Sequence, residues 1–131
     1  MKIVFLEPLG LPIEKIEKEC DNLKKQGHDV VIYKDRCPEK NIERAADADI
    51  VIESNMPLRK DFFDACPNLK MLSIAFTGLD HIDLKECERR GIAVNNAAGY
   101  STEAVAEEVI CMMIGMYRHI RENDKITRSR A

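Results

Sequence analysis

Two short polar turns carry the residues of this chain that could bind a ligand. Thr77 and Gly78 follow one apolar run, and the sequence Gly99-Tyr100-Ser101-Thr102 follows the next. Where a turn leads from a strand into a helix, the first N–H groups of the helix lack partners, and they attract anions together with the helix dipole. The two turns therefore predict a carboxylate site. Each turn alone also has a structural explanation, because Gly78 could relieve backbone strain and Thr102 could cap its helix.

The segments around these turns alternate between predicted strands and helices. An α/β fold is expected, a flavodoxin-like, doubly wound, five-stranded parallel sheet. Asp83, with Glu86 as its reciprocal partner, is expected to cap the start of one of its helices, and Gly91 is expected to cap the end. In such a sheet, ligands bind at the carboxyl ends of the strands, where both turns would lie. The predicted strands are 2–7, 30–33, 50–52, 70–76 and 92–94, and helices are predicted at 13–26, 41–48 and 59–65.

A long final helix, from about residue 102 to residue 126, differs from the others. Its segment 109–117 reads VICMMIGMY and has no charge on any face. A helix that is apolar all round is either buried on all sides or covered by a partner. We expect a second subunit, or a further part of the protein, to cover it. A well-buried core helix is the alternative.

Composition excludes several classes of protein. The net charge of −3, with Lys and Arg interleaved with acidic residues, is not typical of a nucleic-acid-binding protein. The five cysteines are widely spaced and form no C-x-x-C pair, so we expect reduced thiols, a cytoplasmic protein and no metal site. No apolar run approaches the ~20 residues that a membrane-spanning helix needs. We therefore expect no membrane partner.

Nucleotide-binding motifs are missing from the sequence. Neither G-x-G-x-x-G nor G-x-x-x-x-G-K-[ST] occurs, and the six glycines are too dispersed to form either. The segment after the first strand, 7–12, lacks the hydroxyl groups with which flavodoxins bind phosphate. The strand ends also lack the acidic pair, aspartate and lysine of a receiver domain. Both flavin binding and phosphotransfer are therefore disfavoured.

A series of motifs, in order and at the right spacing, resembles the D-isomer-specific 2-hydroxyacid dehydrogenases. The resemblance is close in the second half of the chain, and in the first half it extends only to the rhythm of strands and helices. The motifs are Pro67-Asn68-Leu69-Lys70, Ala75-Phe76-Thr77-Gly78-Leu79-Asp80-His81-Ile82-Asp83, Gly91-Ile92-Ala93-Val94, Asn96-Ala97-Ala98-Gly99-Tyr100-Ser101-Thr102 and Val105-Ala106-Glu107.

The resemblance implies a substrate-binding domain over residues 1–101 and a long interdomain or dimerisation helix over 102–131. In that family the helix leads into a Rossmann domain that binds NAD or NADP, and a hydride passes between the nicotinamide and C2 of a 2-oxo or 2-hydroxy acid. By this resemblance, the turn at Thr77-Gly78 binds the acid's carboxylate, and a homodimer forms through the 102–126 helix. The implied substrate-binding residues are Asn55, Phe76, Thr77 and Gly78, with Tyr100, Ser101 and Thr102 near the cofactor.

The catalytic arginine, acid and histidine of that family, like its cofactor loop, would lie beyond this sequence. We therefore assign no catalytic residue, and we expect the chain alone to bind no cofactor and to be inactive. His81 and His119 are not taken as replacements, because no motif positions a carboxylate beside either. Phe76 stands where many members of the family have glycine, which leaves the substrate size open. The alternative hypothesis is a non-catalytic, self-associating α/β binding module.

Overall fold

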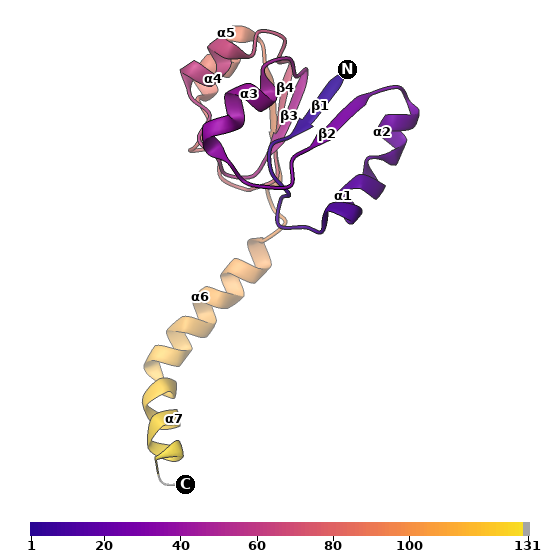
Figure 1. Cartoon of the computed structure of the whole chain (residues 1–131). Coiled ribbons are helices and arrows are strands. Elements are labelled where there is room, and N and C mark those ends of the chain that lie inside the picture. The colour runs from indigo at the N-terminus through magenta and orange to yellow at the C-terminus, as the bar shows by residue number, and fades with distance from the viewer. Residues whose placement is uncertain (130–131) are drawn as a thin grey trace. The chain divides into compact units, whose positions relative to one another are not determined.

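The computed structural model describes residues 1–129 of the 131-residue chain (Figure 1). It divides into two units, Met1–Ala98 and the segment from Gly99 onward. The first unit contains all the strands and the candidate acid-binding turn, and the second consists of two helices. Each unit is described by itself.

The first unit is built on a five-stranded sheet in which every neighbouring pair of strands is parallel. The strand order is β2-β1-β3-β4-β5, which is the flavodoxin-like order and confirms the predicted fold. β3 and β4 pair directly, so the segments that follow them leave the sheet side by side. The strands are β1 (Lys2–Phe5), β2 (Asp29–Ile32), β3 (Ile50–Glu53), β4 (Met71–Ile74) and β5 (Ala93–Asn96).

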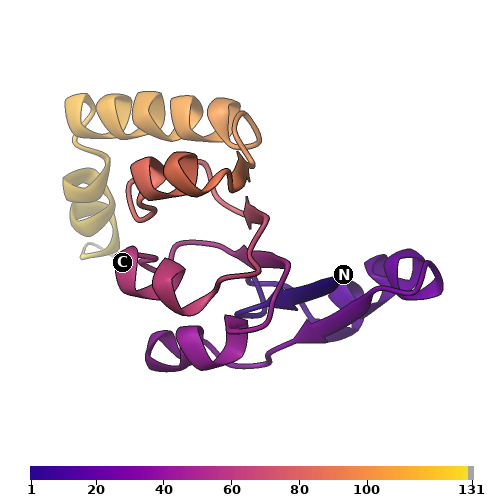
Figure 2. The ribbon, with the colours of Figure 1, turned by 90° about the horizontal axis from the view of Figure 1, so that it is seen from above.

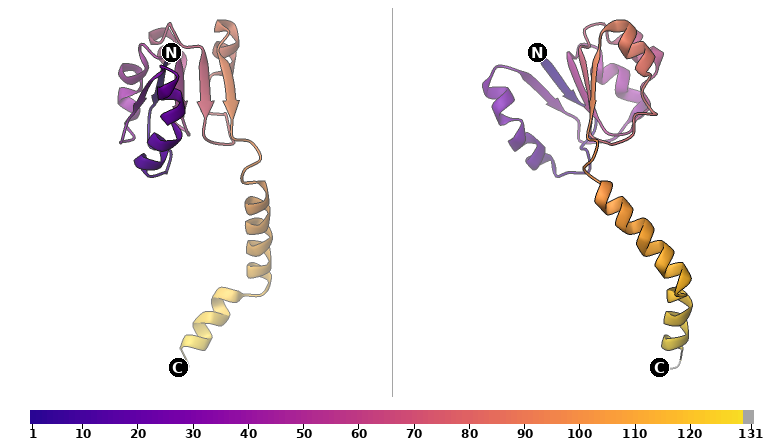
Figure 3. Two further views of the ribbon diagram at one scale, coloured as in Figure 1. Left: turned by 90° about the vertical axis from the view of Figure 1, so that its right-hand side faces the viewer. Right: turned by 180° about the vertical axis from the view of Figure 1, so that it is seen from behind.

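Helices cover both faces of the sheet (Figures 2 and 3). α1 (Ile13–Glu19) and α2 (Asp21–Lys25) cover one face, and the stretch predicted as a single helix over 13–26 is thus divided at Cys20. The other face is covered by the 3₁₀ helix η1 (Pro38–Lys40) and by α3 (Asn41–Ala45), α4 (Lys60–Ala65) and α5 (Leu84–Arg90).

The core lies on both sides of the sheet, because alternate residues of a strand face opposite ways. In β1, Ile3 and Phe5 pack with Ile16 of α1, whereas Val4 faces the larger cluster under α3, α4 and α5. Phe63 of α4 is fully buried in that larger cluster. Two covered faces fix the sheet and hence the positions of its carboxyl ends.

α5 confirms the predicted caps. The Asp83 carboxylate accepts a hydrogen bond from the backbone N–H of Glu86 at 3.1 Å. Gly91 ends the helix in the left-handed conformation, with φ of 69°. The predicted reciprocal bond from Glu86 is wrong, because its carboxylate pairs with Arg89 and Arg90 and the Asp83 N–H donates to the Leu58 carbonyl. These caps hold the helix that follows the candidate turn.

The second unit corrects the prediction of one helix over 102–126. It contains α6 (Thr102–Tyr117) and α7 (Ile120–Arg128), which are separated at His119. His119 adopts φ of 50°, a left-handed conformation that interrupts the helical hydrogen bonds. The sequence has no proline or glycine there to signal this break.

The apolar side chains of α6 are not covered within this unit. Val109, Met113 and Met116 are 51%, 54% and 78% exposed. Apolar surface of this extent is typical of a helix that meets another protein surface. Among residues 1–129, none of the helices is both long and apolar enough to cross a membrane.

Candidate functional site

The turn Thr77–Leu79 follows β4 after two residues, Ala75 and Phe76. Ahead of it, the Phe76 carbonyl accepts a hydrogen bond from the Ala97 N–H at 3.0 Å, and the Thr77 carbonyl accepts one from the Asn96 side chain at 2.7 Å. Within the described residues, 1–129, the backbone N–H groups of Thr77, Gly78 and Leu79 donate no hydrogen bond. Three neighbouring donors at a strand end are therefore free for an anion.

Gly78 is not required by the backbone of this turn. Its φ is not positive, unlike that of Gly91 or Gly99. A Cβ added there would lie 3.6 Å from an Asp80 carboxylate oxygen, which is an ordinary contact. The explanation of Gly78 as a relief of strain is therefore wrong. A ligand that must approach the backbone gives a separate reason for glycine.

Phe76 lies beside the turn and not beneath it. Its side chain is 40% exposed, and its ring comes within 4.0 Å of the position that a Cβ on Gly78 would take. The ring therefore lies at the open edge of the sheet and is not packed under the turn. The ring thus presents an apolar surface beside the turn.

Asn55 is held at the same edge of the sheet, just after β3. Its side-chain oxygen accepts a hydrogen bond from the Arg36 guanidinium at 2.7 Å. Arg36 lies 3.6 Å from the buried carboxylate of Glu7, which also accepts hydrogen bonds from the backbone N–H and the hydroxyl of Ser54. The structure thus places Asn55 and the Thr77–Leu79 turn at the ends of two adjacent strands.

A buried carboxylate and a histidine lie at this edge and were not assigned from the sequence. Glu53, the last residue of β3, is fully buried, and one of its oxygens lies 2.8 Å from Nε2 of His81. Burial raises the pKa of Glu53, while hydrogen bonds from the Met56 N–H and from His81 oppose that rise. No sequence motif places this carboxylate beside His81; the fold does. A glutamate ending an apolar strand was the only sequence signal.

Tyr100, Ser101 and Thr102 belong to the second unit, so their predicted place near a cofactor stays a prediction. Ser101 is the N-cap residue of α6, and its side chain makes no capping hydrogen bond. Thr102 is the first residue of the helix and does not cap it, which corrects that explanation. Tyr100 is 68% exposed.

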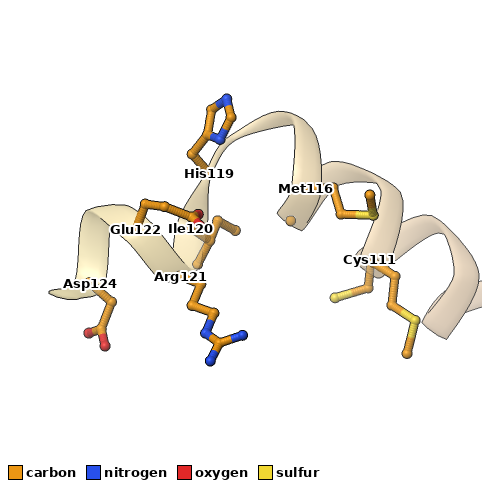
Figure 4. Close-up of a pocket in the computed structure, with 9 residues that line it drawn as sticks. Cys111, Met116, His119, Ile120, Arg121, Glu122 and Asp124 are labelled. Atoms are coloured by element: carbon orange, nitrogen blue, oxygen red, sulfur yellow. The ribbon is translucent and has the colours of Figure 1, made fainter.

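A groove in the second unit lies at the bend between α6 and α7 (Figure 4). Cys111, Met112 and Met116 line it from α6, and Ile120 and Arg121 line it from α7. It is an apolar surface with a charged border. No group of three or more His, Cys, Asp or Glu residues that could hold a metal ion occurs in the described part of the chain.

Residues 3–112 match the sequence model of a family described as "D-isomer specific 2-hydroxyacid dehydrogenase, catalytic domain". A Haemophilus influenzae protein described as a 2-hydroxyacid dehydrogenase is 36% identical over 116 residues. That match covers 88% of this chain but only 36% of the relative. The chain therefore spans about a third of the length of this relative.

Solved structures show the same architecture. An acyclic imino acid reductase in complex with NADPH and D-Arg superposes with a TM-score of 0.84 and 28% identity, covering 100% of this chain and 42% of that one. An NAD-dependent formate dehydrogenase from Staphylococcus aureus, in complex with NAD, gives a TM-score of 0.79 and 26% identity, with 94% and 40% covered.

Proposed function

Because the chain belongs to the D-isomer-specific 2-hydroxyacid dehydrogenase family, we propose that it is the substrate-binding part of an NAD- or NADP-dependent dehydrogenase. Its substrate is a small 2-oxo or 2-hydroxy acid. The observation that carries this proposal is the turn Thr77–Leu79, where no hydrogen bond within residues 1–129 uses the three backbone N–H groups. A carboxylate with several acceptor positions matches such a set of donors.

Neighbouring residues supply the rest of the proposed pocket. The exposed ring of Phe76 limits one side, so a substrate with a small group on C2 is favoured. Asn55, held by Arg36, offers its amide N–H₂ group to a substrate oxygen. Tyr100, Ser101 and Thr102 complete the site from the cofactor side in this proposal.

The nicotinamide cofactor does not fit the residues of this chain. Its six glycines are dispersed and form no loop that could receive a pyrophosphate. We propose that residues outside this sequence bind NAD or NADP and supply the groups that transfer the proton. When bound, the cofactor would exchange a hydride with C2 of the acid, while this chain binds and orients that acid.

Saturation-transfer NMR tests this function directly. Pyruvate, glyoxylate and hydroxypyruvate should give signal transfer from the chain, whereas methyl pyruvate, which lacks the carboxylate, should give much less. NADH mixed with the chain and each acid should show no decrease in absorbance at the nicotinamide band. Equal signals from the ester and the acid would contradict the carboxylate site, and measurable NADH oxidation would contradict the inactivity of this chain alone.

Self-association through α6 is a second proposal, supported by the exposed side chains of Val109, Met113 and Met116. A dimer interface of ordinary size buries ~1,600 Å² in total, and an apolar helix with its flanks supplies the centre of one. The partner in this proposal is a second copy of the chain. We propose that the protein is located in the cytoplasm, where its five free thiols would stay reduced. Light scattering should give twice the mass of one chain, and a monomer at high concentration would refute it.

A further inference from the structure

Glu53 and His81 form a pair that the proposed site does not use. The carboxylate is completely buried, and the imidazole is 13% exposed. One Glu53 oxygen lies 2.8 Å from Nε2 of His81, and the other accepts the Met56 N–H at 2.7 Å. A substrate in solvent cannot reach this carboxylate. Any role of the pair in binding must act through the residues that it holds.

Stability alone does not account for the buried carboxylate of Glu53 at the end of β3. The preceding residues of the strand, 50–52, are all aliphatic, and a further aliphatic side chain would remove the need to desolvate a carboxylate. Buried ion pairs are often no more stabilising than apolar residues of the same size. Such a pair fixes the relative orientation of the two segments that carry it, because its hydrogen bonds form in only one arrangement.

The pair connects β3 with the segment that follows the candidate turn. His81 lies three residues after Gly78, and its carbonyl accepts the Leu58 N–H at 3.0 Å. The Asp83 N–H donates to the Leu58 carbonyl at 3.2 Å, which continues this contact along the chain. The His81 ring therefore joins a backbone contact that anchors the downstream side of the turn.

The upstream side is anchored separately, by the bond from the Asn96 side chain to the Thr77 carbonyl at 2.7 Å. Between the two anchors, the N–H groups of Thr77, Gly78 and Leu79 have no acceptor within residues 1–129. The Thr77 and Gly78 N–H groups belong to peptides whose carbonyls accept bonds from the Ala97 N–H and from the Asn96 side chain, whereas the Gly78–Leu79 peptide makes no hydrogen bond within residues 1–129. The direction of the donors thus depends on Ala97 and Asn96 upstream and on the segment held by His81 downstream.

We propose that His81, held by Glu53, is a positioning residue that orients the backbone N–H groups of the Thr77–Leu79 turn toward the substrate's carboxylate. The ligand class rests on the proposed function, whereas the orienting of the turn does not. His81 and Glu53 transfer no proton in this proposal. Their effect on the substrate is the preorganisation of donors that would otherwise reorient on binding.

The test uses the ¹⁵N-labelled chain and oxamate, an unreactive analogue of a 2-oxo acid. His81→Leu should lower the heteronuclear NOE of the three turn amides and weaken oxamate binding about tenfold, as the loss of one such hydrogen bond predicts. His81→Gln, whose amide can donate to Glu53 in place of Nε2, should restore both readouts. His28→Leu, in the turn before β2, is the matched control and should change neither.

The outcomes separate the two proposals. If oxamate shifts no turn amide of the unaltered chain but His81→Leu still loosens the turn, the acid function fails and the positioning role stands. If His81→Leu lowers stability while the NOE values and the binding stay unchanged, the role is merely structural and the inference is overturned. Should His81→Leu not fold, Glu53→Leu/His81→Leu replaces it, because exchanging both partners for apolar residues is often neutral to stability.

Discussion

The two units of this protein differ in how far their apolar side chains are buried. Met1–Ala98 buries them in two clusters, one on each face of its sheet. In the helical unit no residue of α6 is buried, and Tyr117 is 86% exposed. The first unit therefore has its own hydrophobic core, whereas the second exposes apolar side chains along α6. The candidate acid site lies on the first unit, where rigid strands can hold it.

The largest expected effect is on the core of the α/β unit. Phe63→Ala removes a fully buried ring that packs edge-on against Phe62, with centroids 5.5 Å apart, and should lower the free energy of unfolding by about 3–5 kcal/mol. Phe76→Ala, at an exposed position, is the matched control, with a change of about 0.5 kcal/mol or less. Urea unfolding measures both, and equal losses would contradict the described core.

Charged substitutions on α6 should weaken the association of two chains and should not affect folding. Ile110→Glu/Met113→Glu places two charges on the exposed apolar surface of α6 and should weaken a dimer at least about a hundredfold, because charges in an apolar interface are desolvated. Light scattering across a dilution series measures this. Glu103→Gln, in the first turn of α6, should leave the mass unchanged. A double variant that dimerises as tightly as the parent would show that α6 is not the interface.

Low pH should reduce the stability of the α/β unit, in part through the protonation of Glu86. Arg89 and Arg90 lower the pKa of Glu86 from its ordinary 4.5 to about 2. A carboxylate with a lowered pKa in the folded state stabilises the fold above its unfolded pKa, and that contribution is lost as the pH falls toward 2. Glu86→Gln should therefore be less stable than the parent at pH 6, with a difference that shrinks between pH 4.5 and pH 2. A constant difference in urea midpoints would contradict this coupling.

The smallest effect is expected at the bend of the helical unit. The left-handed conformation of His119 costs a non-glycine residue about 1 kcal/mol. His119→Gly should keep the bend, whereas His119→Ala should favour one continuous helix and raise the helical signal in far-UV circular dichroism. The ¹³Cα shift of residue 119 distinguishes the two conformations. Identical spectra for the two variants would show that this backbone angle does not set the bend.

Local patterns explain what could be predicted from the sequence. The strands alternate with helices because short apolar runs and cap residues such as Asp83 and Gly91 act within a few positions of one another. The turn at Thr77-Gly78 was found in the same way, as a polar break after an apolar run. Its unpaired N–H groups lie just beyond the last inter-strand bonds of β4, in which the Ala75 N–H donates to the Glu53 carbonyl and the Phe76 carbonyl accepts the Ala97 N–H.

Contacts between distant residues could not be predicted. Glu53 and His81 are 28 positions apart, and only the order of β3 and β4 in the sheet brings them together. The break at His119 has a different cause, since one left-handed residue ends a helix without any change in the apolar pattern. Sequence patterns therefore predicted the turn after β4 but not the buried pair of Glu53 and His81.

Titration of the ¹⁵N-labelled chain with pyruvate, compared with Gly78→Ala, tests the central claim most directly. We predict saturable shifts of the Thr77, Gly78 and Leu79 amides. We also predict that Gly78→Ala weakens binding about tenfold, with an unfolding free energy close to that of the parent, because the added Cβ meets no close neighbour in the fold. Shifts confined to other residues, or unchanged affinity in Gly78→Ala, would contradict the assignment of this turn as the carboxylate site.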